Sequence, residues 1–299
     1  MRIRAADRRE ADLSITTQSC AETILGSGVS FGMIVIKIGG SEGTDFAAIC
    51  GDVAERIAAG EKFVIVHGGS NETNKLSEAL GRPPRFVTSV SGQVSRYTDR
   101  ATLEMFAMAV AGKVNTLLVE ALQRHGVNAL GLTGLDGRLL EARRKDTIKI
   151  VEDGKTKILR DDFTGKIERV NVALLRLLLD QGYAPVVAPL AISTGNEAVN
   201  VDGDRAAAMI AGALQADMLI IFSNVPGLLR DVGDPASLIE EIRRDRLEEF
   251  AGFAAGRMKK KIMGADEALR GGVKEIRLAD GRVANPLRNA LEGRCTVIR

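Results

Sequence analysis

The sequence predicts an α/β fold, an αβα sandwich of three layers in which helices cover both faces of a central, mostly parallel sheet. Short apolar runs rich in β-branched residues recur along the chain, and longer amphipathic segments separate them. Parallel strands that are buried on both faces appear as continuous apolar runs, and helices form the crossovers between them. With 299 residues, the chain can bury the core of one large domain or of two lobes.

The expected strands follow one another at intervals that leave room for helices. They are MIVIKI at 33–38, FVIV at 63–66, VNALGL at 127–132, APVVAPL at 184–190, DMLIIF at 217–222, EIRLAD at 275–280 and CTVIR at 295–299. We place an approximate boundary between two lobes near residues 189–196. We therefore expect an N-lobe over residues 33–190 and a C-lobe over residues 191–299.

The first 32 residues differ from the rest. They carry scattered charges, Ser and Thr, without the apolar centre that a secretory signal needs. Met33, where the first strand-like run begins, is itself a candidate start codon. We interpret residues 1–32 as an N-terminal extension, either a disordered tail or a misassigned start, with an oligomerisation arm as the functional alternative.

Charge and composition argue against several classes of function. Lys and Arg total 41 against 39 Asp and Glu, so a net charge of +2 points neither to nucleic acid nor to an anionic membrane as a partner. The 3 cysteines are far apart and suit a reducing cytoplasm, and 2 histidines argue against a zinc site. No apolar stretch approaches the roughly 20 residues that a membrane helix needs. We expect a cytoplasmic protein without a metal site of its own.

One region interrupts the regular pattern of strands and helices. Residues 147–159, TIKIVEDGKTKIL, alternate apolar and polar side chains around EDGK, which predicts a β-hairpin with its turn at Asp153 and Gly154. Residues 138–160 contain eight basic and four acidic residues, a local charge of +4. This basic region is either a solvated face or a docking surface for an acidic partner.

Glycine pairs follow two of the expected strands. Gly39 and Gly40 come after the first, and Gly68 and Gly69 come after the second, within VIVHGGSNETNK at 64–75. This stretch is not a P-loop, because Asn precedes its lysine and Leu follows it, and it lacks the third glycine of a dinucleotide fingerprint. Because parallel sheets bind ligands at the carboxyl ends of their strands, we expect both pairs to face one phosphate.

Charged residues stand at two further places of interest. Lys37 lies inside an apolar strand, and a buried ammonium needs either a ligand anion or a structural ion pair. We favour phosphate contact. Asn200, Asp202 and Asp204 precede a long Ala-rich helix, and either acid is placed to cap its N-terminus.

The lysine run in GRMKKKIMGADEALRGG, residues 256–272, can be divided by helical geometry. At about 100° per residue, the apolar side chains form one stripe, made of Met258, Ile262, Ala265 and Leu269. Lys261 flanks this stripe, whereas Lys259 and Lys260 are expected to point outward. Of the three lysines, Lys261 is therefore the one expected to reach a cleft.

Several motifs occur in a characteristic order. They are KIGGS from residue 37, VHGGS from 66, GQVSRYTDRATLEMFAMAVAGKVNTLLV from 92, GLTGLDGRL from 131, NVDGDRAA from 200, SNVPGLL from 223 and GRMKKKIMGADEAL from 256. Together they resemble the amino acid kinase family, specifically its acetylglutamate kinase branch, over residues 33–299. Within that branch, HGGS, SRYTDR, ARRK after GLTGLDGRL, and GRMKKK are similar to the [LysW]-aminoadipate kinases. Those enzymes phosphorylate aminoadipate that is attached through its amino group to an acidic carrier protein in lysine biosynthesis.

The resemblance implies an amino acid kinase (carbamate kinase-like) fold and an ATP-dependent carboxylate kinase, with Mg²⁺ bridging the phosphates of ATP. Lys37 would contact the transferring phosphoryl group, Lys261 would stabilise the leaving side of ATP, and Asp204 would hold both lysines. Because a carboxylate nucleophile is already ionised at neutral pH, it needs no general base. His67 is accordingly expected to be structural.

The resemblance also implies binding roles. Backbone N–H groups of the two glycine pairs would bind phosphate oxygens, with Gly68 and Gly69 on the substrate side and Gly39 and Gly40 on the nucleotide side. Arg96 and Asn200 would hold the acyl substrate, the arginine by pairing with a carboxylate. Ser223 and Gly227 would border the nucleotide. The acyl substrate would thus belong to the N-lobe and the nucleotide to the C-lobe.

The implied partner is an acidic, LysW-like amino-group carrier protein bearing aminoadipate, with the basic hairpin as its docking surface. Carrier-linked glutamate is a further substrate in some archaeal relatives, and a homodimer is expected. The main alternative is N-acetylglutamate kinase of arginine biosynthesis. A silent nucleotide sensor is disfavoured by the intact Lys37, Asp204 and Lys261, and a nicotinamide dehydrogenase by the absent fingerprint.

Overall fold

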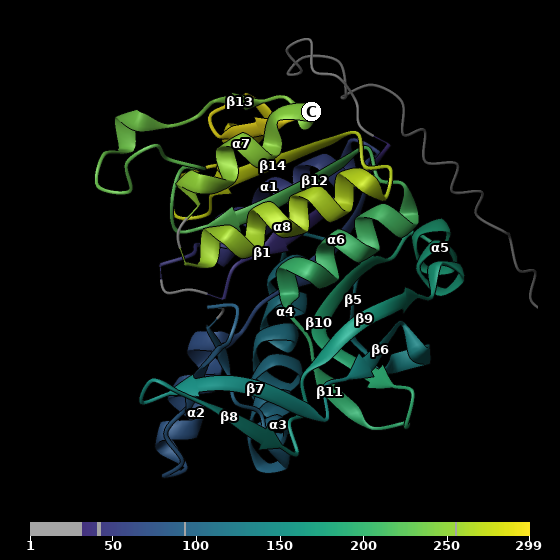
Figure 1. The fold of residues 1–299 in the computed structure, drawn as a ribbon. Coiled ribbons are helices and arrows are strands. Elements are labelled where there is room, and N and C mark those ends of the chain that lie inside the picture. Colours follow the sequence, from purple (N-terminus) through teal and green to yellow (C-terminus); the bar gives the residue numbers. More distant parts are fainter. Residues whose placement is uncertain (1–31, 41–42, 93, 255) are drawn as a thin grey trace, which may run out of the picture. The chain divides into compact units, whose positions relative to one another are not determined.

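The computed structural model describes residues 32–40, 43–92, 94–254 and 256–299. The described residues belong to one compact unit (Figure 1). Apart from Gly32, the extension predicted over residues 1–32 lies outside the described residues.

A large sheet of eleven strands forms the centre of this unit. Its main path runs β13–β15–β14–β12–β1–β2–β10–β6–β9, and β11 and β5 also pair with β10. The strands are β1 (Met33–Ile38), β2 (Lys62–His67), β5 (Ala129–Gly134), β6 (Leu140–Arg144), β9 (Gly165–Val170), β10 (Ala184–Ser193), β11 (Ala198–Asn200), β12 (Met218–Ser223), β13 (Glu241–Ile242), β14 (Glu275–Asp280) and β15 (Thr296–Ile298). Only the pairs β14–β15, β10–β11 and β6–β9 are antiparallel among these described strands. The mostly parallel sheet and all the strands predicted for it are confirmed.

Side chains of the central strand alternate between two apolar cores, so both faces of the large sheet are covered. Val35 of β1 lies in one core, whereas Ile34, Ile36 and Ile38 lie in the other. The core around Val35 includes side chains of α5 (Val172–Asp180), α6 (Gly203–Leu214) and α8 (Arg257–Arg270), and the opposite core those of α1 (Phe46–Ala58), α4 (Thr116–Arg124) and α9 (Pro286–Leu291). The predicted αβα sandwich is therefore confirmed, and Figure 1 shows α6 and α8 side by side on one face.

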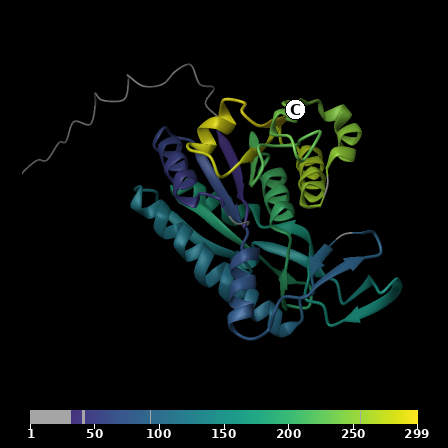
Figure 2. The ribbon, with the colours of Figure 1, turned by 90° about the vertical axis from the view of Figure 1, so that its left-hand side faces the viewer.

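A separate small sheet carries the predicted hairpin. It has four strands in the order β4 (Val94–Arg96), β3 (Phe86–Ser89), β7 (Thr147–Glu152) and β8 (Lys155–Arg160), all antiparallel. The turn between β7 and β8 lies at Asp153 and Gly154, with φ of 53° and 72°, as the twist of a two-residue hairpin requires. The hairpin is confirmed, and Figure 2 shows it extending away from the large sheet.

The remaining helical segments lie in the connections between strands. They are α2 (Ser70–Ala79), α3 (Arg100–Ala107), a π-helical segment (Met108–Asn115), α7 (Leu247–Phe250) and four short 3₁₀ turns (Asp136–Arg138, Pro235–Ser237, Arg244–Arg246 and Ala251–Phe253). α3, the π-helical segment and α4 form one 25-residue helix, Arg100–Arg124. Contrary to expectation, this helix is long and apolar enough to match the length and composition of a membrane span. Its buried side chains, among them Leu103, Val110, Leu118 and Leu122, pack into the cores of the protein, as in a core helix.

The two predicted lobes share the large sheet. β1 and β12, from opposite sides of the predicted division, are paired neighbours from Ile34↔Met218 to Ile38↔Phe222. The expected boundary near residues 189–196 begins inside β10. The division into an N-lobe and a C-lobe remains a prediction.

Candidate active site

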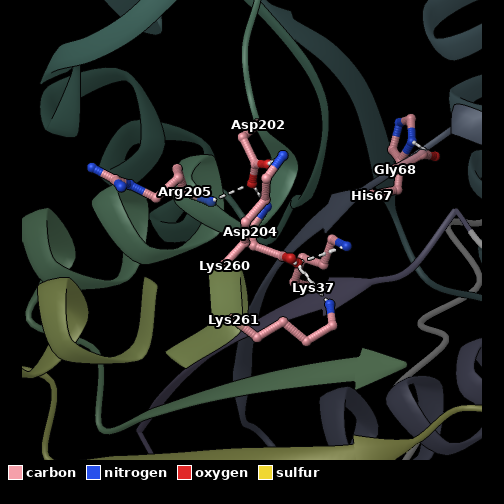
Figure 3. Close-up of polar contacts among 8 residues, drawn as sticks. All are labelled: Lys37, His67, Gly68, Asp202, Asp204, Arg205, Lys260 and Lys261. Atoms are coloured by element: carbon pink, nitrogen blue, oxygen red, sulfur yellow. Dashed lines mark hydrogen bonds and ion pairs between the residues drawn. The ribbon is translucent and has the colours of Figure 1, made fainter. Parts of the chain in front are cut away.

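Three buried charged residues from three elements meet at the carboxyl end of β1. Lys37 of β1 places its Nζ 2.7 Å from Asp204 Oδ1, and Lys261 of α8 places its Nζ 3.2 and 3.0 Å from the two oxygens of the same carboxylate (Figure 3). Each of the three residues is 7–8% exposed. The predicted inward orientation of Lys261 is confirmed. We call this group the Lys37–Asp204–Lys261 cluster.

The electrostatics of the cluster favour an anion. Burial alone would raise the pKa of Asp204, but the two ammonium groups outweigh burial and hold the pKa of that carboxyl well below its usual range. Burial, followed by repulsion from Lys37, lowers the pKa of Lys261. With both lysines protonated, two positive charges share one negative charge. A buried excess of one positive charge is stabilised by an incoming anion, such as a phosphate.

The start of α6 places Asp204 in this cluster. Asp202 caps the helix, because its Oδ1 accepts hydrogen bonds from the N–H groups of Asp204 and Arg205 at 2.9 and 3.2 Å. A Cβ on Gly203 would lie 3.2 Å from the His67 carbonyl oxygen and 3.5 Å from Lys37 Cε. Glycine therefore lets the first turn of α6 approach the ends of β1 and β2. The capping interpretation holds for Asp202, whereas Asp204 belongs to the cluster.

The two glycine pairs touch each other, as expected from the parallel pairing of β1 and β2. A Cβ on Gly40 would lie 2.4 Å from Gly69 N, and one on Gly68 would lie 2.8 Å from Gly40 N. Side chains are thus excluded, and backbone groups face the site. Gly69 caps α2, so the positive end of a helix dipole lies beside the pairs. The N–H of Gly68 already donates to the Ile38 carbonyl at 2.9 Å. This N–H group is therefore not available for the phosphate contact predicted for Gly68.

The predicted nucleotide residues differ in their surroundings. Ser223 ends β12 next to the first glycine pair, since Phe222 pairs with Ile38 and a Cβ on Gly39 would lie 3.0 Å from the Phe222 carbonyl oxygen. Gly227 packs elsewhere, because a Cβ there would lie 2.4 Å from Thr296 Oγ1. Tight packing explains glycine at this position, and its contact with a nucleotide remains a prediction.

Arg96 presents an unsatisfied donor in a buried setting. Its Nη2 donates to the carbonyl and Oγ of Ser70 at 3.2 and 3.3 Å and to Asn74 Oδ1, while its guanidinium lies 5.1 Å from the centre of the Phe86 ring. Nη1 is buried without a hydrogen-bond partner. Burial lowers the pKa of Arg96, yet a guanidinium stays charged. Buried donors are costly to leave unpaired, so Nη1 suits an acceptor such as a ligand carboxylate.

Two hydrogen bonds link Asn200 through Thr98 to the backbone of Arg96. Asn200 Nδ2 donates to Thr98 Oγ1 at 3.2 Å, and Thr98 in turn donates to the Arg96 carbonyl at 3.1 Å. The fully buried Asp162 accepts from Thr98 N and from Thr164, which fixes the end of β4. No role was predicted for Asp162, which stands in a loop without a spacing signal. Thr98 lies within the SRYTDR motif, in which only Arg96 was given a role.

Comparisons with known proteins agree with this geometry. The model of the amino acid kinase family matches residues 32–280, most of the chain. The chain belongs to the amino acid kinase family. It is 56% identical over 266 residues to the [LysW]-aminoadipate kinase of Deinococcus radiodurans, covering 89% of this chain and 91% of that protein. It is 55% identical over 269 residues to the [LysW]-aminoadipate kinase of Thermus thermophilus, covering 89% and 100%.

More distant proteins are similar in sequence or in fold. The acetylglutamate kinase of Methanopyrus kandleri is 39% identical over 269 residues, covering 89% of this chain and 100% of that protein. Among solved structures, N-acetylglutamate synthase of Neisseria gonorrhoeae superposes with a TM-score of 0.72 at 28% identity; 89% of this chain matches 59% of the synthase. Carbamate kinase of Giardia lamblia, at 16% identity and a TM-score of 0.63, shares the fold over 90% of this chain and 98% of that one. The predicted resemblance and fold are confirmed.

In this member of the amino acid kinase family, His67 is buried and bonded to the protein through both ring nitrogens. Its Nδ1 donates to the Gly68 carbonyl at 3.0 Å, so its Nε2 accepts from Asn115 Nδ2, also at 3.0 Å. Burial lowers the pKa of His67 to about 4, and the ring is neutral at pH 7. Asn115 ends the π-helical segment, and a lone Asn in an apolar helix was its only sequence signal. These contacts support the structural role predicted for His67.

The buried His67 predicts a pH dependence of stability. The unfolded chain binds a proton near pH 6.5, but the folded protein binds it only near pH 4, so the free energy of unfolding should fall as pH drops through this window. His67→Gln is expected to flatten the profile there by an amount on the order of a few kcal/mol. Urea titrations from pH 4 to pH 8 measure it. His125→Gln, at an exposed position, is the control, and equal slopes in wild type and His67→Gln would contradict this prediction.

One prediction about the lysine run was wrong. Lys259 is exposed as expected, but Lys260 donates from its Nζ to the Val94 carbonyl at 3.1 Å and lies 3.8 Å from Asp202 Oδ2. Angular position on a helix does not limit a long side chain that finds a neighbouring strand within reach.

Proposed function

We propose that this protein is an ATP-dependent kinase that phosphorylates the side-chain carboxylate of aminoadipate held on a LysW-like carrier protein, in lysine biosynthesis. The observation that carries the mechanism is the buried, positively charged Lys37–Asp204–Lys261 cluster beside two glycine-rich strand ends. The names of the relatives at 55–56% identity over 89% of the chain support the substrate. An archaeal relative at 42% identity, from Nitrosopumilus maritimus, is named for carrier-linked aminoadipate or glutamate, so carrier-linked glutamate is a further candidate.

The proposed reaction needs charge neutralisation and positioning. A carboxylate oxygen of the substrate attacks the γ-phosphorus of ATP, the bond to the β–γ bridging oxygen breaks, and ADP leaves an acyl phosphate behind. A unit-charge pair at 4 Å is worth roughly 4 kcal/mol at an effective dielectric of 20, so repulsion between the two anions is a large part of the barrier. We assign Lys37 to the transferring phosphoryl group and Lys261 to the leaving side. Asp204 holds both ammonium groups in place.

Phosphate binding is assigned to backbone groups. We assign it to the N–H groups of Gly39, Gly40 and Gly69 and exclude Gly68, whose N–H is engaged. Ser223 and Gly227 would border the nucleotide. No cluster of three His, Cys, Asp or Glu side chains lies among the described residues, and Asp204 is engaged by two lysines. The residues therefore suit Mg²⁺ that arrives on the ATP phosphates, where it would neutralise phosphate charge.

We assign the acyl substrate to Arg96 and Asn200. The unpaired Nη1 of Arg96 suits a substrate carboxylate. Asn200 Nδ2, held by Thr98, lies on the same hydrogen-bonded chain and suits a second polar group of the substrate. Arg96→Lys would keep the charge but lose the planar pair of donors.

One face of the small sheet supports a protein-borne substrate. The registers Lys149↔Ile158, Thr88↔Val151 and Phe86↔Arg96 put these side chains on one face, since directly opposed residues share a face. Phe86, Val94, Val151 and Ile158 are 42–56% exposed on that face. Exposed apolar groups among basic ones favour an acidic protein partner. The face ends at Arg96, so a docked carrier would present its substrate to the site.

Charge reversal in the hairpin tests this docking. Arg144 is unsuitable, because it lies 3.6 Å from the centre of the Phe163 ring and pairs with Glu197. Lys149→Glu/Arg160→Glu, at exposed positions on this face of the small sheet, is expected to weaken carrier binding by about tenfold and to reduce its salt dependence, with ATP affinity unchanged. Titration calorimetry at two salt concentrations measures both.

The control for the hairpin variant is Arg176→Glu, an exposed residue on α5. It changes the net charge of the protein without touching the small sheet. If the double variant binds the carrier as tightly as wild type does, the hairpin is not a docking surface, and its basic residues form a solvated face.

The alternative of a free N-acetylglutamate kinase is supported by acetylglutamate kinases at 34–39% identity. We place it second, because the carrier-linked kinases are more similar and the apolar, basic face suits a protein-borne substrate. We also propose a cytoplasmic homodimer, in which residues 33–190 together with Asn200 bind the acyl substrate, and residues 191–299 together with Gly39 and Gly40 bind the nucleotide.

Trapping of the product tests the proposed reaction. The purified protein with ATP, Mg²⁺, hydroxylamine and aminoadipyl carrier is expected to form a hydroxamate on the carrier, one per ADP released. ADP release without hydroxamate, or neither product, would contradict it.

A further inference from the structure

Lys260 forms a hydrogen bond between α8, which carries Lys261, and β4, which carries Arg96. It lies on α8, one residue before Lys261, and donates to the carbonyl of Val94 in β4 at 3.1 Å. Its Nζ is also 3.8 Å from Asp202 Oδ2, the oxygen that does not cap α6. About a third of each of these two side chains is exposed, 32% for Lys260 and 36% for Asp202. Figure 3 shows Lys260 beside Asp202 at the start of α6.

The hydrogen bond from Lys260 holds β4, which is an edge strand of the small sheet. β4 pairs with β3 alone within the small sheet, so its other side presents backbone groups without a strand partner there. The ammonium group of Lys260 satisfies one of these carbonyl groups by a charge-assisted hydrogen bond. The strand extends only from Val94 to Arg96, so a restraint at its first residue also acts on its last.

The two ends of this connection carry residues assigned to different ligands. Arg96, two residues beyond Val94, is assigned to the acyl substrate, and Lys261, next to Lys260, to ATP. Phosphoryl transfer requires the acceptor oxygen and the γ-phosphorus at a fixed, short separation. We infer that Lys260 is a positioning residue that holds β4, and with it Arg96, against α8. Its kinetic consequences rest on the proposed function, whereas its structural consequence does not.

Amide hydrogen exchange in the ligand-free protein tests the structural part. Lys260→Met is expected to speed exchange in peptides covering β3 and β4 by about fivefold, because the edge strand opens more often. Lys259→Met removes an exposed lysine from the preceding position and should exchange as wild type does. Lys260→Arg should restore slow exchange, since a guanidinium also donates to a carbonyl. Unchanged exchange in Lys260→Met would overturn the inference.

Steady-state kinetics test the functional part. Lys260→Met should raise KM for the aminoadipyl carrier about fivefold, with kcat and the KM for ATP within about twofold of wild type. A fall in kcat as large as that of Lys261→Met, or a rise in the KM for ATP, would instead make Lys260 a direct ligand of the phosphates. If wild type does not phosphorylate the carrier, the proposed function fails, and the exchange experiment still decides the role of Lys260.

Discussion

Replacing Lys261 with methionine is expected to lower kcat by about a thousandfold. Methionine has a similar length and no charge, so the change removes a cation that we place against the leaving side of ATP. The roughly 4 kcal/mol of a charge pair at 4 Å corresponds to a rate change of this order. Lys37→Met is expected to have an effect of the same order, because the two ammonium groups share one carboxylate.

The fold should survive the Lys261 change. Asp204 keeps Lys37 as a partner at 2.7 Å, so no acid is left unpaired in the interior. Acyl phosphate formation, followed as hydroxamate, measures kcat, and urea unfolding measures stability. Lys259→Met is the matched control on the same helix, with its side chain in solvent. A kcat within tenfold of wild type in Lys261→Met would remove that lysine from the mechanism.

Replacing Asp204 with asparagine is expected to lower the free energy of unfolding by about 3–5 kcal/mol and to abolish most activity. The change keeps the shape of the side chain but leaves two buried ammonium groups without their carboxylate. Breaking one side of a buried ion pair is costly because the remaining charge stays desolvated. Urea unfolding at pH 7 measures the loss.

A double variant shows whether the loss of stability in Asp204→Asn comes from the unpaired lysines or from a local disturbance of the structure. In the background of Lys261→Met, Asp204→Asn strands only one ammonium group and should cost less than it does alone, a non-additive result. Asp202→Asn keeps a helix cap at the same turn and should change stability by less than about 1 kcal/mol. Additive costs in the double variant would show that the Asp204 effect is unrelated to the lysines.

Strong local patterns made the large sheet predictable. β1, β2, β10, β12 and β14 are buried on both faces, and all of them except β14 appear in the sequence as nearly continuous apolar runs. The small sheet was predicted only in part. Its hairpin has alternating residues and a turn at Asp153 and Gly154, but β3 and β4 are short, and their place beside β7 depends on pairing over some sixty residues of chain. Such non-local pairing leaves no periodicity in a single sequence.

The site, like the fold, contains some features that the sequence could predict and others that it could not. Lys37 and Lys261 were identifiable because a charge in an apolar strand and a lysine beside an apolar stripe both need a buried anion. The unsatisfied Nη1 of Arg96 and the hydrogen bond from Asn115 to His67 depend on how distant segments pack. The outward orientation predicted for Lys260 was wrong because the helical angle does not account for β4, whose Val94 carbonyl lies within reach of this side chain.

We propose above all that the acyl group arrives on a protein. Its most direct test compares kcat/KM for aminoadipate on the purified carrier with kcat/KM for free N-acetylglutamate, using one enzyme preparation with ATP and Mg²⁺. We expect the carrier-linked substrate to be preferred by at least about a hundredfold, because the face of the small sheet adds binding that a free acid cannot use. Equal or higher kcat/KM on free N-acetylglutamate would contradict the claim and identify an enzyme of arginine biosynthesis on the same catalytic lysines.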